Sequence, residues 1–307
     1  MFLYPDLVPE LPEVETIARG LDKRVAGDVI ESVWIGSKPQ PLKSPASVIA
    51  WTLEGRRIVR VHRAGKHIVF DLEGAVAHGY HKAGNERARP VRRKTRRAAS
   101  LRRERGGDEK AQWIVHLGMT GSMVVSGAGA EIAKHTHLIA TLASGRELRF
   151  VDPRMFGKLS VHGDGFDPGG IEPLEIGEEQ FRSLFRGRKT PIKSALLNQK
   201  LLRGVGNIYA DESLFRAGIR PRRRSASLTR ERLSKLRSVV QEVLREAITL
   251  GGSSISDYVD ADGEEGFFQL QHRVYGREGE PCLVCKVAIK RVVIAGRSSH
   301  YCPNCQQ

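Results

Sequence analysis

Cys282-Leu283-Val284-Cys285 and Cys302-Pro303-Asn304-Cys305 are the two stretches that decide how the C-terminal part of this chain folds. They hold all four cysteines of the sequence, separated by 16 residues. Each Cys-x-x-Cys turn presents two thiolates, and two such turns form one closed tetrahedral site for zinc. We therefore expect one structural Zn2+, because so short a tail cannot fold on apolar burial alone. A pair of disulfides is the main alternative, and a redox Cys-x-x-Cys pair is disfavoured because no βαβ pattern surrounds it.

The composition of the 307 residues is that of a globular protein with room for about two domains. Lysine and arginine number 50 against 35 aspartate and glutamate, which gives a net charge of +15 and a pI near 10.0. Such an excess favours a polyanionic partner. Hydrophobic residues make up 40% of the chain. This fraction is enough to form a core, and it argues against wholesale disorder. Neither a run of ~18 apolar residues nor a signal peptide is present, so we expect a cytoplasmic protein without a membrane partner.

Apolar periodicity divides the chain upstream of the cysteines into a β-rich part and a helical part. Pro12 suits a first helical turn, and apolar residues recur at helical spacing as far as Val25. Short strand-like runs follow at 29–35, 58–61, 68–72, 113–117, 137–142 and 148–150, which favours a β-sandwich or flattened barrel. From Glu178 the period becomes helical, and a long helix ends at Gly251-Gly252. We predict an α+β fold with a leading helix, a β-sandwich, a helical domain and a C-terminal zinc-finger β-hairpin.

Two segments interrupt this pattern. Residues 74–111 carry 12 lysines and arginines against 4 acidic residues and show no apolar periodicity. We interpret them as a basic, disordered insertion in a hairpin, either a solvated spacer or an auxiliary phosphate-binding element. Residues 163–177 hold five glycines and two prolines, which is typical of an interdomain linker.

Several blocks of the chain resemble the bacterial formamidopyrimidine-DNA glycosylases, the 8-oxoguanine glycosylase/AP lyases. The N-terminal block Pro9-Glu10-Leu11-Pro12-Glu13-Val14-Glu15-Thr16 is similar to the signature of that family. Further similar blocks follow in family order at 116–122, 152–157, 204–210 and 274–277, and the final cysteines complete the series. The resemblance covers nearly everything from Pro9 to Cys305 except the 74–111 insertion, and the opening block favours this branch over endonuclease VIII.

The resemblance implies a domain layout and a partner. Residues 1–8 are an extension, 9–163 the catalytic β-sandwich domain, 164–177 the linker, 178–270 a helix-two-turn-helix domain and 271–307 the zinc finger. The segment 252–268 resembles the mobile loop that closes over an everted oxidised purine. The implied partner is double-stranded DNA with oxidised purines or abasic sites, bound by a monomer.

Five residues match the family's catalytic positions. Base removal followed by strand cleavage needs an amine that attacks C1′ of the deoxyribose, and an N-terminal proline supplies it in the family, at the position of Pro9. Glu10 would be the acid that protonates the sugar ring oxygen or the leaving base, and Glu13 would support it. Without the resemblance, these carboxylates at the start of a helix would only favour the helix dipole. Lys66 matches a lysine that assists β-elimination and binds phosphate, and Arg297 matches a phosphate-binding arginine that assists δ-elimination.

The resemblance also implies a set of DNA contacts. A base that leaves the duplex stack creates a gap to be filled. Met119, Arg154 and Phe156 match the family's intercalating triad, although Met119 and Phe156 alone would suggest core residues. Asn207, at a Gly-rich break before a helix, matches a phosphate-gripping asparagine. The remaining expected phosphate contacts are His135, Arg188, Lys189 and, close to them, Lys193.

One feature departs from the family. Met1 to Val8 precede Pro9, so its nitrogen is a planar amide and not a nucleophile. The tail is then a misassigned start, is cleaved, or abolishes the lyase chemistry. A GTG start codon at position 8 would yield Pro9 as the first residue after removal of the initiator methionine. Two alternatives to the enzyme remain: a lesion-binding protein of the same fold, and a zinc-ribbon architectural protein that binds DNA, which Glu10 and Glu13 disfavour.

Overall fold

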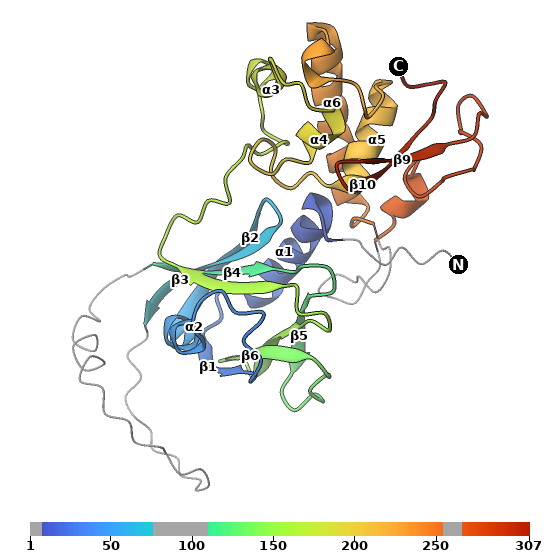
Figure 1. Ribbon diagram of the computed structural model, residues 1–307. Coiled ribbons are helices and arrows are strands. Elements are labelled where there is room, and N and C mark those ends of the chain that lie inside the picture. The colour runs from blue at the N-terminus through green and yellow to red at the C-terminus, as the bar shows by residue number, and fades with distance from the viewer. Residues whose placement is uncertain (1–7, 76–109, 254–265) are drawn as a thin grey trace, which may run out of the picture.

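A computed structural model describes residues 8–75, 110–253 and 266–307 (Figure 1). The predictions for residues 1–7, for 76–109 of the basic insertion and for 254–265 of the lesion loop lie outside the described residues. The described parts have the predicted α+β order of a β-sandwich domain, a helical domain and a C-terminal hairpin. Among the helices of these parts, none has the length and apolar character needed to cross a membrane.

Two antiparallel four-stranded sheets form the N-terminal domain. One sheet has the order β1-β6-β7-β5 and the other the order β2-β3-β4-β8. Trp113 and Phe70 from the second sheet stack on each other and share one apolar core with Phe150 and Leu138 of the first. The predicted sandwich is therefore confirmed. The strands are β1 (Ile30–Ile35), β2 (Arg56–Ala64), β3 (His67–Ala75), β4 (Ala111–His116), β5 (Ser122–Gly127), β6 (Thr136–Leu142), β7 (Arg146–Val151) and β8 (Lys158–His162).

The leading helix α1 (Leu11–Val25) belongs to both halves of the molecule. Leu11 packs into the core of the helical domain, whereas the sandwich core contains Val14, Ile17, Ala18, Leu21 and Val25. Leu11 N also donates a hydrogen bond of 3.0 Å to Gly204 O in that domain. Figure 1 shows α1 lying between the sheets and the helices. The first turn of α1 is thus fixed at the junction of the two domains.

The helical domain is built on α5 (Asn207–Ala217) and α6 (Arg230–Thr249), with the shorter α3 (Glu178–Phe185) and α4 (Ile192–Leu196) beside them. α6 buries an apolar stripe from Leu233 to Ala247, and the Thr229 hydroxyl caps its first turn by accepting from Arg232 N. α5 ends at Gly218, whose φ of 73° is a left-handed C-cap. Short 3-10 turns lie at Ser225–Ser227 and Phe268–Gln271.

The C-terminal hairpin consists of β9 (Lys290–Ile294) and β10 (Arg297–Tyr301). Its small core joins Val274, Ile289 and two cysteines to Phe215 of α5. The hairpin is therefore packed against the helical domain and not held by its cysteines alone.

Three elements were not predicted from the sequence: α2 (Ala46–Leu53), β5 and β8. The expected linker also differs from a free connection. Ile176 is buried in the core of the helical domain, and Ile171 forms a bridge with Leu202. Phe166 packs against the β-sandwich instead, so the 163–177 segment is held by both domains along its length.

Candidate active site

Glu10 lies in contact with Gly206, which follows it by 196 residues in the sequence. Its carboxylate accepts a hydrogen bond of 3.1 Å from Ile208 N in the first turn of α5. A Cβ atom placed on Gly206 would lie 2.1 Å from Glu10 Cδ, so only glycine fits there while the carboxylate keeps this position. The break Gly204-Val205-Gly206 is therefore needed so that α1 and α5 can meet end to end at this carboxylate.

The environment of Glu10 favours its protonated form up to near neutral pH. The side chain is buried, and its Oε2 has no hydrogen-bond partner. Burial is the main reason that the pKa of Glu10 rises to about 7; Lys66 opposes the rise and Glu13 adds to it. A carboxyl group with such a pKa is suited to donate a proton in a reaction at neutral pH.

Glu13 holds the backbone of Glu10 in place. Its Oε2 accepts from Glu10 N at 2.9 Å, and its Oε1 accepts from Ser253 N at 2.8 Å and from the Tyr209 hydroxyl. A Cβ on Gly252 would come within 2.8 Å of the same Oε1. Glu13 therefore ties the start of α1 to α5 and to the segment after α6, which is a positioning role.

Lys66 reaches the same site from the β-sandwich. It occupies the two-residue turn between β2 and β3, after Gly65 with its φ of 60°. Burial lowers the pKa of Lys66, Arg297 acts in the same direction, and Glu10 and Glu13 oppose the change. Its amine is thereby closer to the neutral form than that of an exposed lysine.

A cavity of about 1080 Å3 is lined by three of the five predicted catalytic residues, Glu10, Lys66 and Arg297. Its wall includes Val8, Glu10, Lys66, Asn207 and Arg297, from both domains and the hairpin. Pro9 lies between the lining residues Val8 and Glu10 in the sequence, and it is half-buried. Asn207 Oδ1 is buried without a partner. The volume is ample for a nucleotide.

Lys193 is placed differently from the expectation. Its side chain is only 1% exposed, and Nζ is 2.7 Å from Asp211 Oδ1 and donates to Ser298 O at 2.6 Å. Asp211 also accepts from His300 N at 2.8 Å. Because these groups occupy its ammonium, the buried Lys193 side chain is not presented to DNA in the way that the sequence suggested. It joins α4 to α5 and to β10 immediately after Arg297.

Two loops at the edge of the sandwich carry the predicted intercalating triad. Phe156 is 50% exposed, which is unusual for an aromatic ring, and Arg154 lies over it with 4.9 Å from Cζ to the ring centroid. Met119 is half-buried on the neighbouring loop. Asp152 ties the loops together, since it accepts from Thr120 Oγ1 at 2.6 Å and from Gly157 N at 2.7 Å. The triad is thus presented on a rigid base.

The other predicted phosphate contacts lie at separate edges. His135 has a φ of 69° and its carbonyl accepts from Asp152 N at 3.0 Å, which places it behind the Arg154 loop. Lys189 is exposed between α3 and α4. Arg188 is half-buried, with Nε donating to Leu184 O.

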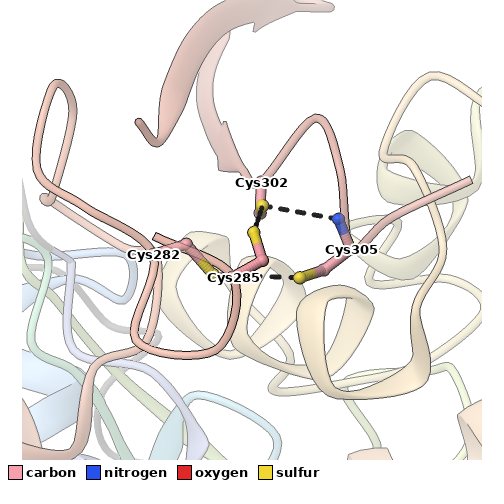
Figure 2. A group of neighbouring side chains, drawn as sticks. All are labelled: Cys282, Cys285, Cys302 and Cys305. Atoms are coloured by element: carbon pink, nitrogen blue, oxygen red, sulfur yellow. Dashed lines mark hydrogen bonds between the residues drawn. The ribbon is translucent and has the colours of Figure 1, made fainter. Parts of the chain in front are cut away.

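The four cysteines converge as predicted (Figure 2). Their sulfur atoms all lie within 4.8 Å of one another, with 3.4 Å between the Cys285 and Cys302 sulfurs and 3.9 Å between those of Cys282 and Cys305. Zn–S bonds of about 2.3 Å in a tetrahedron place sulfurs roughly 3.8 Å apart. The cluster fits one structural zinc.

Comparison with known proteins agrees with this geometry. The model of the formamidopyrimidine-DNA glycosylase N-terminal domain matches residues 8–159, that of the family's H2TH domain matches 170–259, and a zinc finger found in FPG and IleRS matches 279–307. The chain belongs to the formamidopyrimidine-DNA glycosylase family. Family members are base-excision repair glycosylases with AP lyase activity, and the predicted enzyme class is confirmed.

Individual members of the family match over nearly the whole chain. A formamidopyrimidine-DNA glycosylase of Solibacter usitatus is 42% identical, covering 98% of this chain and 100% of that protein. The MutM (FPG) structure from Thermus thermophilus is 38% identical with a TM-score of 0.77, covering 97% and 98%. A Lactococcus lactis FPG mutant in complex with Fapy-dG containing DNA is 32% identical with a TM-score of 0.80, covering 97% and 100%.

Three supporting residues were not singled out from the sequence. Asp152 ties together the loops of the triad, Tyr209 donates to Glu13, and Gly252 leaves room for the Glu13 carboxylate. Asp152 and Tyr209 lie inside quoted sequence blocks, which was the available signal. Their roles depend on partners far away in sequence, and no local pattern indicates those partners.

Proposed function

We propose that this chain excises oxidised purines from duplex DNA and cleaves the resulting abasic site through an imine at Pro9. The observation that carries the proposal is the shared cavity, whose wall includes Glu10, Lys66, Arg297 and Val8, the residue before Pro9. The family's solved complexes with Fapy-dG and abasic-site DNA support this substrate class.

The chemistry follows from the groups in the cavity. The Pro9 amine attacks C1′, the bond from C1′ to the damaged base breaks, and the proton lost by the amine leaves with the base. Glu10, protonated near neutral pH, gives its proton to the ring oxygen as the C1′–O4′ bond opens, which leaves the iminium. Loss of a C2′ proton then expels the 3′ phosphate. By its match to the family lysine, Lys66 assists this elimination, and Arg297 holds the phosphate that leaves in the second elimination.

The proposal requires Pro9 to be the first residue of the active form. In the longer chain the Pro9 nitrogen is an amide, and Val8 occupies part of the cavity wall. Release of residues 1–8 would both free the amine and open this part of the cavity to the sugar.

Borohydride trapping on an 8-oxoguanine:C duplex tests the proposal with two versions of the chain, one starting at Met1 and one at Pro9. We expect a covalent adduct and strand cleavage only for the version that starts at Pro9. If both versions bind the duplex and neither is trapped, the lesion-binding alternative, favoured by the amide at Pro9, replaces the enzymatic one. Sequencing of the native N-terminus separately tests the position-8 start, and finding Met1 or Phe2 there would exclude it.

A further inference from the structure

Two segments of the helical domain form a short antiparallel ribbon beside α4. Ser225 N donates to Thr190 O at 3.0 Å, and Ile192 N donates to Arg223 O at 2.8 Å. Pro191 and Arg224 are therefore the directly opposed residues of a β-bridge. In such a pair, the two opposed side chains lie on the same face.

The exposed face of this ribbon is cationic. Arg222 and Arg224 are exposed, whereas Ser225 between the two exposed positions 224 and 226 is buried. Lys189 is exposed on the other segment, next to the residues that pair with 225 and 226. Arg222, Arg224 and Lys189 thus place three exposed positive charges around the bridge between Pro191 and Arg224.

The ribbon is continuous with the edge of the catalytic cavity. Arg222 Nη2 donates to Val293 O of β9 at 3.2 Å. Val293 is the register partner of Ser298, the residue after Arg297, and Ser298, Arg297 and Arg291 line the cavity. Figure 1 shows α4 beside the β9–β10 hairpin, in agreement with the bond from Lys193 to Ser298 O. A line of cations thus leads from Arg297 across Arg222 to Arg224.

Some arginines of the helical domain are neutralised by acidic side chains, and these three cations are not among them. Arg182, Arg203 and Arg216 each form ion pairs with carboxylates. Within the described parts of the chain, no ion pair joins Lys189, Arg222 or Arg224 to an acidic side chain. A band of unneutralised cations in this arrangement is suited to a linear polyanion.

We propose that Arg222 and Arg224 bind the sugar-phosphate backbone of the duplex flanking the lesion, and so extend the DNA interface beyond the cavity. The inference rests on the proposed function for the placement of DNA at the cavity. It adds a sequence-independent contact on one side of the damaged nucleotide, where the binding energy comes from released counterions.

The test measures how the dissociation constant for an undamaged 24-base-pair duplex depends on salt, by fluorescence anisotropy between 50 and 200 mM NaCl. Each lost phosphate contact reduces the slope of log K against log salt by about 0.9, so we expect the R222Q/R224Q variant to lose about 1.8. R224Q alone, which breaks no hydrogen bond of the described structure, is expected to lose about 0.9. R222K/R224K keeps the charges and is expected to retain most of the slope.

The matched control is R230Q/K235Q, which removes two exposed cations from α6 and is expected to leave the slope unchanged. An unchanged slope in both R224Q and R222Q/R224Q would overturn the proposal, as would an equal loss in the control. Trapping by the Pro9 version is measured in parallel at saturating enzyme. Because the slope is read on undamaged DNA, failure of the imine chemistry and failure of this surface give different results.

Discussion

Replacing Glu10 by glutamine should stabilise the full-length fold while removing its proton donor. The folded state raises the pKa of Glu10 from 4.5 to about 7, mainly through burial. Since one pKa unit corresponds to about 1.4 kcal/mol, ionisation of Glu10 costs the folded state about 3 kcal/mol. Glutamine carries no such cost, and its amide oxygen can still accept from Ile208 N.

The pH window follows from the direction of the pKa change. Below pH 4.5 Glu10 is protonated in both the folded and unfolded states, and it contributes no difference. Between 4.5 and about 7 the unfolded chain binds fewer protons, so folding stability falls as pH rises. Above about 7 the loss is complete and remains constant.

Urea denaturation of wild type and E10Q at pH 4.5 and pH 8 measures this difference. We expect the free energy of unfolding of E10Q to exceed that of wild type by an amount that is about 3 kcal/mol larger at pH 8 than at pH 4.5. E31Q, at an exposed position, serves as the control and should show no comparable change. A difference between E10Q and wild type that is independent of pH would refute the burial argument. In the version that starts at Pro9, the new ammonium beside Glu10 should reduce the effect.

Three further predictions concern the contacts around this site. In G206A the new Cβ would lie 2.1 Å from Glu10 Cδ, so we expect the acid to be displaced and single-turnover base excision to fall by about 10²-fold or more, with zinc content unchanged; excision at the wild-type rate would contradict this. K193M leaves Asp211 buried without its cation and should cost about 3–5 kcal/mol in urea denaturation, and a loss below about 1 kcal/mol would contradict the buried pair. Removal of zinc with a chelator should unfold the 271–307 hairpin and weaken DNA binding reversibly, as followed by circular dichroism and anisotropy; full affinity without metal would exclude a structural role.

The parts of the fold that could be predicted are those with a local pattern. Apolar residues at helical spacing located α1 and α6, and the cysteine spacing located the metal cluster. α2 was missed because its turn-forming neighbours interrupt the period, and two of its apolar side chains, Val48 and Trp51, stay exposed. β8 was missed because it is short and only Leu159 of its five residues is fully buried.

In the candidate site, too, features without a local sequence pattern could not be predicted. Lys193 and Lys189 lie four residues apart and were both predicted to contact DNA, yet one is buried against Asp211 and the other is exposed. The sequence around them does not distinguish the two. The acid that forms an ion pair with Lys193 comes from α5, and the carbonyl that accepts its hydrogen bond comes from β10.

Glu10 gives the reverse case, in which a local pattern suggested an ordinary role. A carboxylate before the first turn of a helix normally faces solvent and favours the helix dipole. Here Leu11 enters the core of the second domain, and this contact draws the preceding carboxylate into the junction against Gly206. The burial that raises its pKa is therefore a consequence of how the two domains meet, and a catalytic acid arises from a residue type and position that usually only begin a helix. Substitutions that loosen the domain junction at Leu11 should consequently lower the pKa of Glu10 even though they leave the carboxylate itself unchanged.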